Sequence, residues 1–92
     1  MTVDRDALMA LLTKAEDAHQ LAYQDTEGVD EEWPMWYADF LIEDLRHILN
    51  VDLTRSELIC VLLNLSRLQP LEAPGEDWQA YYADYLLERY AS

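Results

Sequence analysis

The sequence predicts an all-α protein: a four-helix bundle built from two similar helix-loop-helix halves with pseudo-twofold symmetry. The first observation is composition, because the 92 residues include only two glycines and three prolines and are 51% hydrophobic, which favours helices over strands and turns. The second is an internal repeat: residues 31–44 read EEWPMWYADFLIED and residues 76–89 read EDWQAYYADYLLER. The third is a helical spacing of apolar residues, at steps of three and four.

The length fits a single domain, residues 1–92, with repeat halves at about 4–50 and 53–92. Each predicted hairpin alone has one apolar face and nothing to bury it against. Two similar hairpins can cover each other, so a pseudo-twofold bundle is the natural packing.

The first helix is predicted from Asp4 to about Gln24 because apolar residues recur on one face there. That face contains Leu8, Leu11, Leu12, Ala15, Ala18, His19 and Ala22. The following stretch, DTEGVDEE, includes Gly28 and several charges without a period. It therefore reads as the first connection.

The second helix is expected to begin between Asp30 and Pro34, because proline is tolerated only in the first turn of a helix. It runs to about Leu49, before Asn50. Its predicted inward stripe is Trp33, Trp36, Tyr37, Phe40, Leu41, Asp44, Leu45 and Ile48.

The third helix is predicted to start at Thr54, since Thr54 and Glu57 have the spacing of a capping box, in which each side chain satisfies the other's backbone amide. The apolar residues of this helix cover nearly every side: Leu58, Ile59, Cys60, Val61, Leu62, Leu63, Leu65 and Leu68. Such a helix is buried all round or exposes a face that needs a partner.

The fourth helix is predicted from about Asp77 to Tyr90, after a break at Pro70, Pro74 and Gly75. Its stripe contains Trp78, Tyr81, Tyr82, Tyr85 and Leu86. Together with those of the second helix, these aromatic rings are expected either to fill the core or to form a box that stacks a planar or cationic ligand.

Charge and cysteine content limit the partners and the compartment. Nineteen acidic and six basic residues give a net charge of −13, which repels nucleic acids and anionic membranes and favours a basic partner. The single cysteine, Cys60, cannot form an internal disulfide. No charged leader or apolar stretch of about 20 residues is present, so we expect a cytoplasmic protein.

Two motifs resemble a known group of proteins. They are Ala15-x-x-Ala18-His19-x-x-x-Tyr23 and Trp33-Pro34-x-Trp36-Tyr37-Ala38-x-Phe40-Leu41. The pattern resembles small uncharacterised bacterial proteins in which an Ala-His-Tyr helix precedes a D-W-P-x-W-Y-A-x-Y-L segment. The second half echoes only the later motif, with Gln79 where the motif has proline and no counterpart of His19. The resemblance implies a small helical domain and transfers no catalytic residue.

Polar residues within the apolar stripes are the candidates for function. Asp44 lies in the second helix's stripe, and the repeat places Arg89 at the equivalent position of the fourth helix. A buried charge needs a partner or an opening to water, which suggests that Asp44 and Arg89 meet near the pseudo-twofold axis. The alternative is that Arg89 simply reaches solvent.

His19 is expected to face inward, as a hydrogen-bonded core residue or as a ligand. The pairs Glu16-x-x-His19 and Asp44-x-x-His47 have the spacing found in di-metal helical bundles. The third and fourth helices offer no inward Glu, however, so we expect no metal ligands and no cofactor.

The sequence leaves three functions open. The leading one is a non-catalytic interaction domain that binds a protein partner or forms a homodimer through the third helix, because neither a catalytic triad nor a phosphate loop is recognisable. The second is a small-molecule or metal-binding protein, with a cleft built from candidate ligand-binding residues His19, Tyr23, Trp36, Asp44, Tyr81 and Arg89. The third is an acidic mimic of nucleic acid, suggested only by charge.

Overall fold

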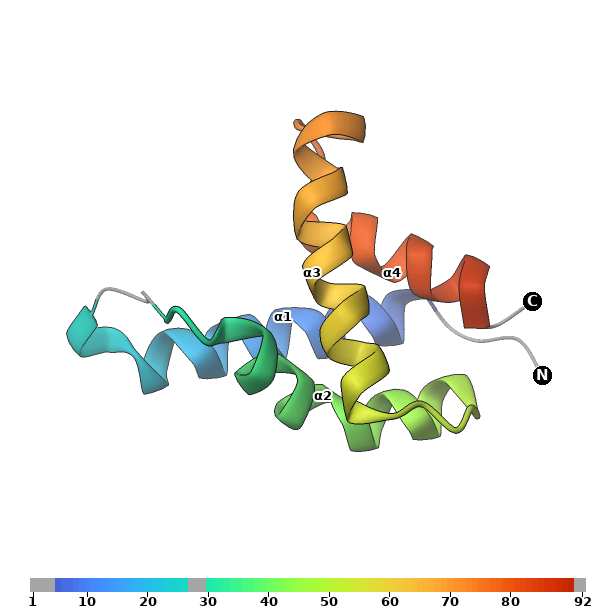
Figure 1. Cartoon of the computed structure of the whole chain (residues 1–92), viewed down its shortest axis with the longest axis horizontal. Coiled ribbons are helices and arrows are strands. Elements are labelled where there is room, and N and C mark those ends of the chain that lie inside the picture. Colours follow the sequence, from blue (N-terminus) through green and yellow to red (C-terminus); the bar gives the residue numbers. More distant parts are fainter. Residues whose placement is uncertain (1–4, 27–29, 91–92) are drawn as a thin grey trace.

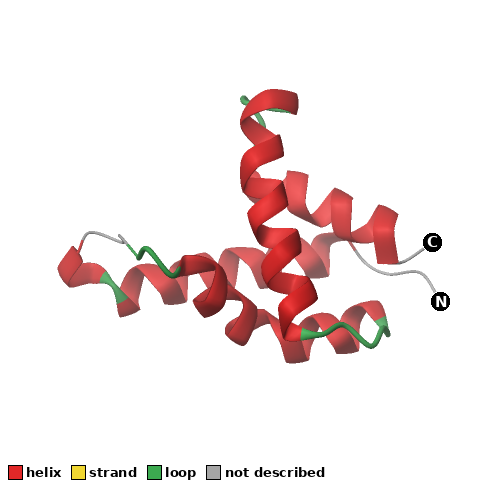
Figure 2. Cartoon of the chain, viewed as in Figure 1, coloured by secondary structure: helices red, strands yellow, loops and turns green. Residues whose placement is uncertain are grey.

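The computed structural model describes residues 5–26 and 30–90, and its regular elements are all helical (Figure 2). They are α1 (Arg5–Ala22), the short 3-10 helix η1 (Gln24–Thr26), α2 (Trp33–Leu49), α3 (Arg55–Glu72) and α4 (Trp78–Tyr90). The predicted all-α class with four helices is confirmed. None of the described helices has the length and apolar character needed to cross a membrane.

The four helices pack as a crossed arrangement rather than as a parallel set (Figure 1). Helix α1 packs against both α2 and α4, α2 packs against α3, and the contact between α3 and α4 is the least extensive of these. In Figure 1, α3 stands across the other three helices and its C-terminal end projects from the molecule. The radius of gyration of 12.9 Å is close to the value of about 12 Å expected for a compact chain of this length.

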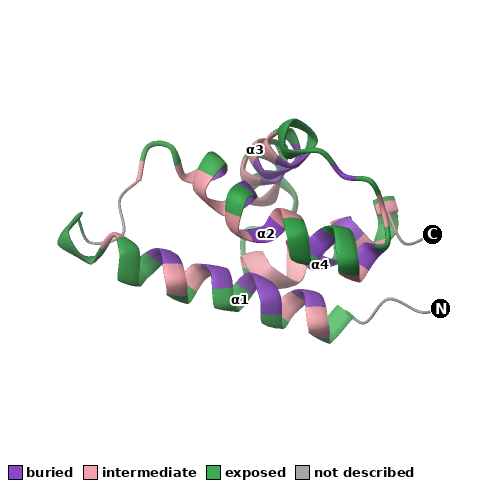
Figure 3. Ribbon diagram, turned by 90° about the horizontal axis from the view of Figure 1, so that it is seen from below, coloured by how far each residue is buried: buried purple, intermediate pink, exposed green. Residues whose placement is uncertain are grey.

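Leucines from α1, α2 and α3, with Leu53 from the loop before α3, supply the fully buried large side chains. These are Leu8, Leu12, Leu41, Leu45, Leu53, Leu58 and Leu65. Figure 3 shows the buried face of α1 turned towards α2 and α4. Each such side chain contributes about 1.5–3 kcal/mol when it leaves water, and the fully buried Ala15, Ala38 and Ala83 let the helix backbones approach closely.

The ends of α2 and α3 follow from local chemistry. Pro34 lies in the first turn of α2, and Asn50 ends this helix with left-handed backbone angles, φ 54° and ψ 48°, a conformation that asparagine tolerates well. Thr54 caps α3, as predicted, and its hydroxyl oxygen accepts a hydrogen bond from the Glu57 backbone N–H at 3.1 Å. The reciprocal bond differs, because the Glu57 carboxylate accepts from the Thr54 hydroxyl at 3.2 Å rather than from a backbone amide.

The expected break at Pro70 was wrong, because α3 continues through this residue to Glu72. A proline ring removes only one hydrogen-bond donor, and near the end of a helix little of the ladder is lost. The Ala73 N–H donates to the Gln69 carbonyl at 2.8 Å and closes the last turn. The extra turn lengthens the projecting end of α3.

The expectation that Asp44 faces the interior was also wrong, since Asp44 is exposed. The buried residues of α2 are Pro34, Ala38, Leu41, Leu45 and Leu49, while the aromatic residues flank this line and are only partly buried. Asp44 precedes Leu45, a step of about 100° around the helix, so its carboxylate lies in solvent.

The predicted meeting of Asp44 and Arg89 does not occur among the ion pairs of the described residues. Arg89 is exposed, and its guanidinium carbon lies 5.5 Å from the centre of the Tyr90 ring. Neither charge is buried, so neither needs the other.

Two equivalent aspartates of the repeat make equivalent ion pairs. Asp39 in α2 accepts from Arg55, the first residue of α3, with Nε and Oδ1 2.5 Å apart. Asp84 in α4 accepts from Arg5, the first described residue of α1, at 2.6 Å. The hydrogen bond from Arg55 holds the pKa of Asp39 below its ordinary value. Each aspartate therefore links its own helix to the start of a helix from the other half.

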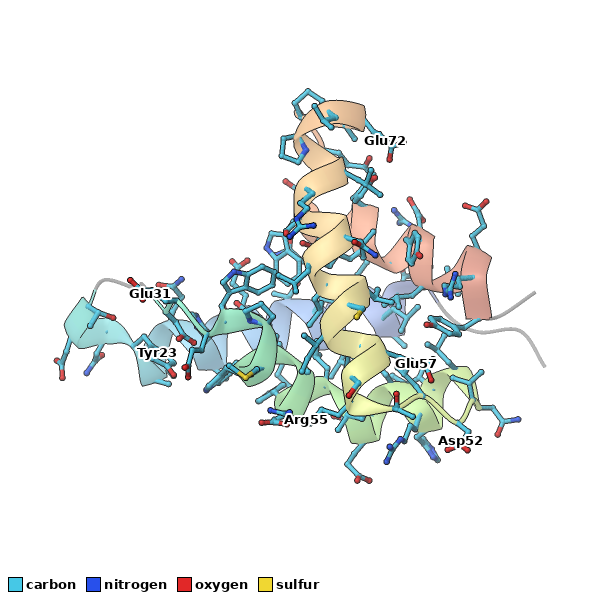
Figure 4. The ribbon with its side chains drawn as sticks, in the orientation of Figure 1. Tyr23, Glu31, Asp52, Arg55, Glu57 and Glu72 are labelled. Atoms are coloured by element: carbon cyan, nitrogen blue, oxygen red, sulfur yellow. The ribbon has the colours of Figure 1, made fainter. Side chains whose placement is uncertain are left out.

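Helix α3 is buried on one side and leaves apolar side chains exposed at its projecting end. Leu58, Val61, Leu62 and Leu65 are buried, whereas Leu68 is 39% exposed and Leu71 82% exposed. Figure 4 labels Glu72 at this end and Glu57 at the opposite end of the helix. The predicted excess of apolar surface on the third helix thus lies in its last turns.

Candidate ligand-binding cleft

The two copies of the repeat contribute the same pair of aromatic residues to one cleft. Trp33 and Tyr37 come from α2, and the equivalent Trp78 and Tyr82 come from α4. These four side chains line an open cleft of about 280 Å³ together with His19, Gln20, Asp30 and Leu62. Every α-helix of the fold supplies at least one lining residue.

The four rings meet edge to face along the cleft. Trp33 and Tyr37 have centroids 6.1 Å apart with an interplanar angle of 77°, and Trp78 and Tyr82 lie 5.2 Å apart at 78°. Tyr37 and Trp78 join the two copies at 6.0 Å and 80°. Edge-to-face pairs at these distances are attractive because a positive ring edge meets a negative ring face, so the contact between Tyr37 and Trp78 joins the two aromatic pairs into one series.

A buried histidine and aspartate form one end of the cleft. His19 is 4% exposed, and its Nε2 lies 3.2 Å from Oδ2 of Asp30, whose side chain is 8% exposed. The second oxygen of Asp30, Oδ1, accepts from the Glu32 backbone N–H at 3.0 Å. Because buried polar groups need partners, this pair fixes the segment before α2 against α1. The inward orientation predicted for His19 is confirmed.

Glu16 positions the start of α4 on α1. Its Oε2 accepts hydrogen bonds from the indole N–H of Trp78 and from the Gln79 side-chain amide, the latter at 3.1 Å. Glu16 lies one helical turn before His19, so two polar side chains of α1 reach towards α2 and α4 at neighbouring levels. Loss of the Glu16 side chain would leave the indole N–H of Trp78 without a hydrogen-bond partner among the described residues.

Tyr37 lies where the acidic groups of the cleft converge. Burial raises its pKa to about 12, with further contributions from the charges of Glu16, Tyr82 and Asp30, so its hydroxyl is protonated at neutral pH. Among the described residues, the hydroxyls of Tyr37 and Tyr82 have no hydrogen-bond partner. Burial also raises the pKa of Tyr82. The cleft therefore offers two neutral phenol groups to a ligand.

The structure brings together only part of the predicted ligand-binding set. Tyr23 and Trp36 contact the His19 ring, with centroids 4.7 Å and 4.9 Å away, but His19 alone of the set lines the cleft. The hydroxyl of Tyr81 instead donates to Glu72. Asp44 is exposed on α2, and Arg89 lines a separate groove between α3 and α4.

Besides His19, the cleft is lined by residues outside the predicted ligand-binding set, although the alternative of an aromatic box included its four aromatic members. These residues are Gln20, Asp30, Trp33, Tyr37, Leu62, Trp78 and Tyr82. The repeat contained the signal for the four aromatic residues, since Trp33 aligns with Trp78 and Tyr37 with Tyr82. Nothing in the sequence indicated that these pairs meet, because their meeting depends on how α2 and α4 each pack against α1.

The two predicted carboxylate-histidine pairs do not form a metal site. Glu16 bonds to Trp78 and His19 to Asp30, whereas Asp44 and His47 are exposed. Within residues 5–26 and 30–90, no group of three or more His, Cys, Asp or Glu side chains is placed to hold a metal ion.

No protein-family model, curated protein or solved structure matches this chain. The resemblance of its first half to small bacterial proteins therefore stays a prediction. What the cleft can bind follows from its own geometry and charge.

Proposed function

We propose that this chain is a non-catalytic protein-interaction module whose aromatic cleft receives a side chain of the partner. One observation carries the proposal: both copies of the repeat direct a Trp and a Tyr into the same open cleft. Trp and Tyr are enriched at protein interfaces because they combine a large apolar surface with a polar group.

The size of the cleft favours a single side chain as its occupant. Its volume of about 280 Å³ falls just below the range of about 300–1,000 Å³ that is typical of pockets for drug-sized ligands. Open access and two phenol hydroxyls without a hydrogen-bond partner among the described residues suit a group presented from outside, with the rest of the partner lying on the surrounding surface.

The composition of the cleft supports a binding role rather than catalysis. A buried His-Asp pair also occurs in enzymes, where the histidine activates a nearby nucleophile. No Ser, Thr, Cys or Lys is among the residues that line this cleft, and Cys60 lines the separate groove between α3 and α4. His19 and Asp30 thus serve here to hold the wall of the cleft in place.

Net charge bears on the choice of partner. A chain with a charge of −13 attracts a basic protein and repels a second copy of itself. Self-association through α3 is the second candidate, favoured by the exposed Leu68 and Leu71. Light scattering on the wild type and on Leu71→Glu tests it: a dimer that the variant converts to monomer supports self-association, and a wild-type monomer removes it.

The binding proposal is tested by N–H correlation NMR with capped amino acids, each bearing one type of side chain, as probes. The chain has three tryptophans, so its indole signals report separately on Trp33 and Trp78, which line the cleft, and on Trp36, which does not. At least one probe is expected to shift the Trp33 and Trp78 signals saturably while Trp36 moves less. If every probe leaves both signals unchanged, the cleft is not a binding site.

Adjacent tyrosines provide a matched pair of variants for the same titration. Tyr82 lines the cleft, whereas Tyr81 bonds to Glu72 outside it. Tyr82→Phe is expected to weaken the binding of the probe, and Tyr81→Phe is expected to leave it unchanged. Equal effects of the two substitutions would show that the signal does not come from the cleft.

We also propose that the repeat reflects an approximate twofold relation between the halves 4–50 and 53–92. Two observations support it: the equivalent ion pairs of Asp39 and Asp84, and the equal length of α1 and α3, each of 18 residues. The relation is not uniform, because α3 contacts α4 less extensively than α1 contacts α2.

A further inference from the structure

The cleft combines negative charge with an absence of lysine and arginine side chains. Asp30 lies in its wall and Glu16 directly behind Trp78, and both carboxylates act on the hydroxyl of Tyr37. None of the chain's lysines and arginines is among the lining residues. In a site of lowered dielectric, two carboxylates with at most a histidine beside them favour a cation over a neutral or anionic group.

The aromatic walls favour the same kind of ligand. Indole and phenol faces carry negative charge density and attract a cation within about 6 Å of the ring centre. The four rings of the cleft meet at 77°, 80° and 78°, so successive rings form corners rather than one flat stack. Corners of this kind can surround a compact charged group on several sides.

The hydrogen bonds that the two carboxylates already make favour lysine over arginine as the bound side chain. Arginine prefers a carboxylate that offers both oxygens to its planar fork. Both oxygens of Asp30 are already engaged, by His19 and by the Glu32 amide, and Oε2 of Glu16 already accepts from Trp78 and Gln79. A compact ammonium needs no such bidentate contact, and the free hydroxyl oxygens of Tyr37 and Tyr82 can accept its N–H groups.

We infer that the group bound in the cleft is the protonated amine of a lysine side chain, presented by a basic protein partner. This inference rests on the proposed function, since it specifies the side chain that enters the same cleft. The ammonium lies among the four rings, its charge is balanced by Glu16 and Asp30, and the aliphatic stem runs out through the open side.

The test is an NMR titration with N-acetyl-lysine N-methylamide and its neutral counterpart, N-acetyl-norleucine N-methylamide, at constant ionic strength. These probes share the same stem and differ mainly in the ammonium group. The lysine probe is expected to shift the Trp33 and Trp78 indole signals with millimolar affinity, and the norleucine probe to bind at least about tenfold more weakly, the factor that corresponds to one charge-assisted hydrogen bond.

Other outcomes separate the lysine inference from the proposed function. If the norleucine or arginine derivative binds in the cleft as tightly as lysine, the inference fails and the function as a side-chain receptor stands. If a free alkylamine binds more tightly than both the lysine probe and a lysine-containing peptide, the ligand is a small amine and the inference of a protein lysine fails. If no probe shifts the indole signals, both are wrong.

A charge-neutral variant makes the test specific. Glu16→Gln keeps an acceptor oxygen for Trp78 and removes one negative charge, so it is expected to weaken lysine binding by roughly three- to tenfold, as for loss of one partly exposed charge interaction, and to leave norleucine binding unchanged. Glu72→Gln, at the far end of α3 (Figure 4), is the control and is expected to have little effect. Equal losses in the two variants would overturn the proposed role of the cleft charge.

Discussion

The leading helices of the two halves, α1 and α3, bury leucines at matching positions and differ in the polar contact near their C-terminal ends. When α1 and α3 are aligned at their first residues, Arg5 and Arg55, the buried Leu8 matches the buried Leu58 and Leu12 matches Leu62. The same alignment pairs His19 with Gln69. His19 bonds to Asp30 in the connection that follows α1, and Gln69 bonds to the Glu76 carbonyl in the connection that follows α3, at 2.7 Å.

The polar contacts that follow α1 and α3 show which features of the cleft are repeated and which are not. In both halves, a polar side chain near the end of the leading helix fastens the connection before the aromatic helix. In the first half that contact is the buried pair of His19 and Asp30 beside the cleft. In the second half it is an exposed hydrogen bond from the side-chain amide of Gln69. The repeat therefore accounts for the four aromatic walls, and the unrepeated Asp30 and Glu16 supply the negative charge of the cleft.

The largest effects are expected from equivalent core leucines. Leu41 and Leu86 align in the repeat, and both are buried. Replacement of either by alanine should lower the free energy of unfolding by about 2–5 kcal/mol, because transfer energy is lost and a cavity is left. Chemical denaturation measures both values. A loss at Leu86 that is several-fold smaller than the loss at Leu41 would contradict a core shared by the two halves.

Smaller and unequal losses of stability are expected when His19 and Gln69, which occupy matching positions of α1 and α3, are replaced. His19→Gln gives the first half the residue of the second, and it should cost about 1–3 kcal/mol because the buried Asp30 loses part of its hydrogen bonding. Gln69→Ala removes an exposed bond and should cost less than about 1 kcal/mol. Denaturant unfolding of both variants gives the comparison, and equal losses would mean that burial of His19 and Asp30 adds nothing to stability.

Sequence reasoning predicted the four helices from the helical spacing of their apolar residues. For α2 and α3 there were also local signals: the proline in the first turn of α2, the asparagine after that helix and the cap of α3 at Thr54. It was wrong at Pro70, since a proline stop signal takes no account of how little of the helix remains to be disrupted. It was wrong about Asp44 because the predicted stripe of α2 follows the aromatic residues, whereas the interior is lined by the smaller residues beside them.

The site was less predictable than the fold because it depends on contacts between helices. His19 could be recognised as an inward polar residue from its place on the apolar face of α1. The partners of Asp39 and Asp84 had a signal that was not used, namely an aspartate repeated in both YAD segments with an arginine at the start of α3 and of α1. The pairing of Glu16 with Trp78 joins residues far apart in the chain and had no local signal.

Ionisation of Tyr37 tests the crowded position of its hydroxyl in the cleft. Burial and the charges beside Tyr37 raise its pKa from 10.0 to about 12. The folded state thus holds this proton more tightly than the unfolded state, and the resulting stability is complete below about pH 10 and is lost as pH rises towards 12. The phenolate absorbance of wild type minus that of Tyr37→Phe should show one group titrating near pH 12. A difference titration centred at pH 10 would contradict the crowded position of this hydroxyl.

The smallest effects are expected from the equivalent surface ion pairs. Arg55 lowers the pKa of Asp39, so the stability from this pair is present above the ordinary aspartate pKa and is lost as pH falls through the lowered value. Asp39→Asn should therefore flatten the acid limb of the stability curve slightly, an effect that salt weakens. Unfolding measured across acidic pH in low and high salt tests this. An unchanged acid limb would mean that the Asp39 pair does not form in solution.

The most direct test of the cleft is a nuclear Overhauser measurement between aromatic side chains of the two repeats. Tyr37 should show contacts to Trp33 in its own helix and to both Trp78 and His19, because the ring centroids lie within 6.1 Å in each case. Contacts from Tyr37 to Trp78 and His19 would establish that both copies of the repeat meet beside the histidine. A Tyr37 ring that contacts Trp33 but neither Trp78 nor His19 would mean that the two copies do not share one cleft.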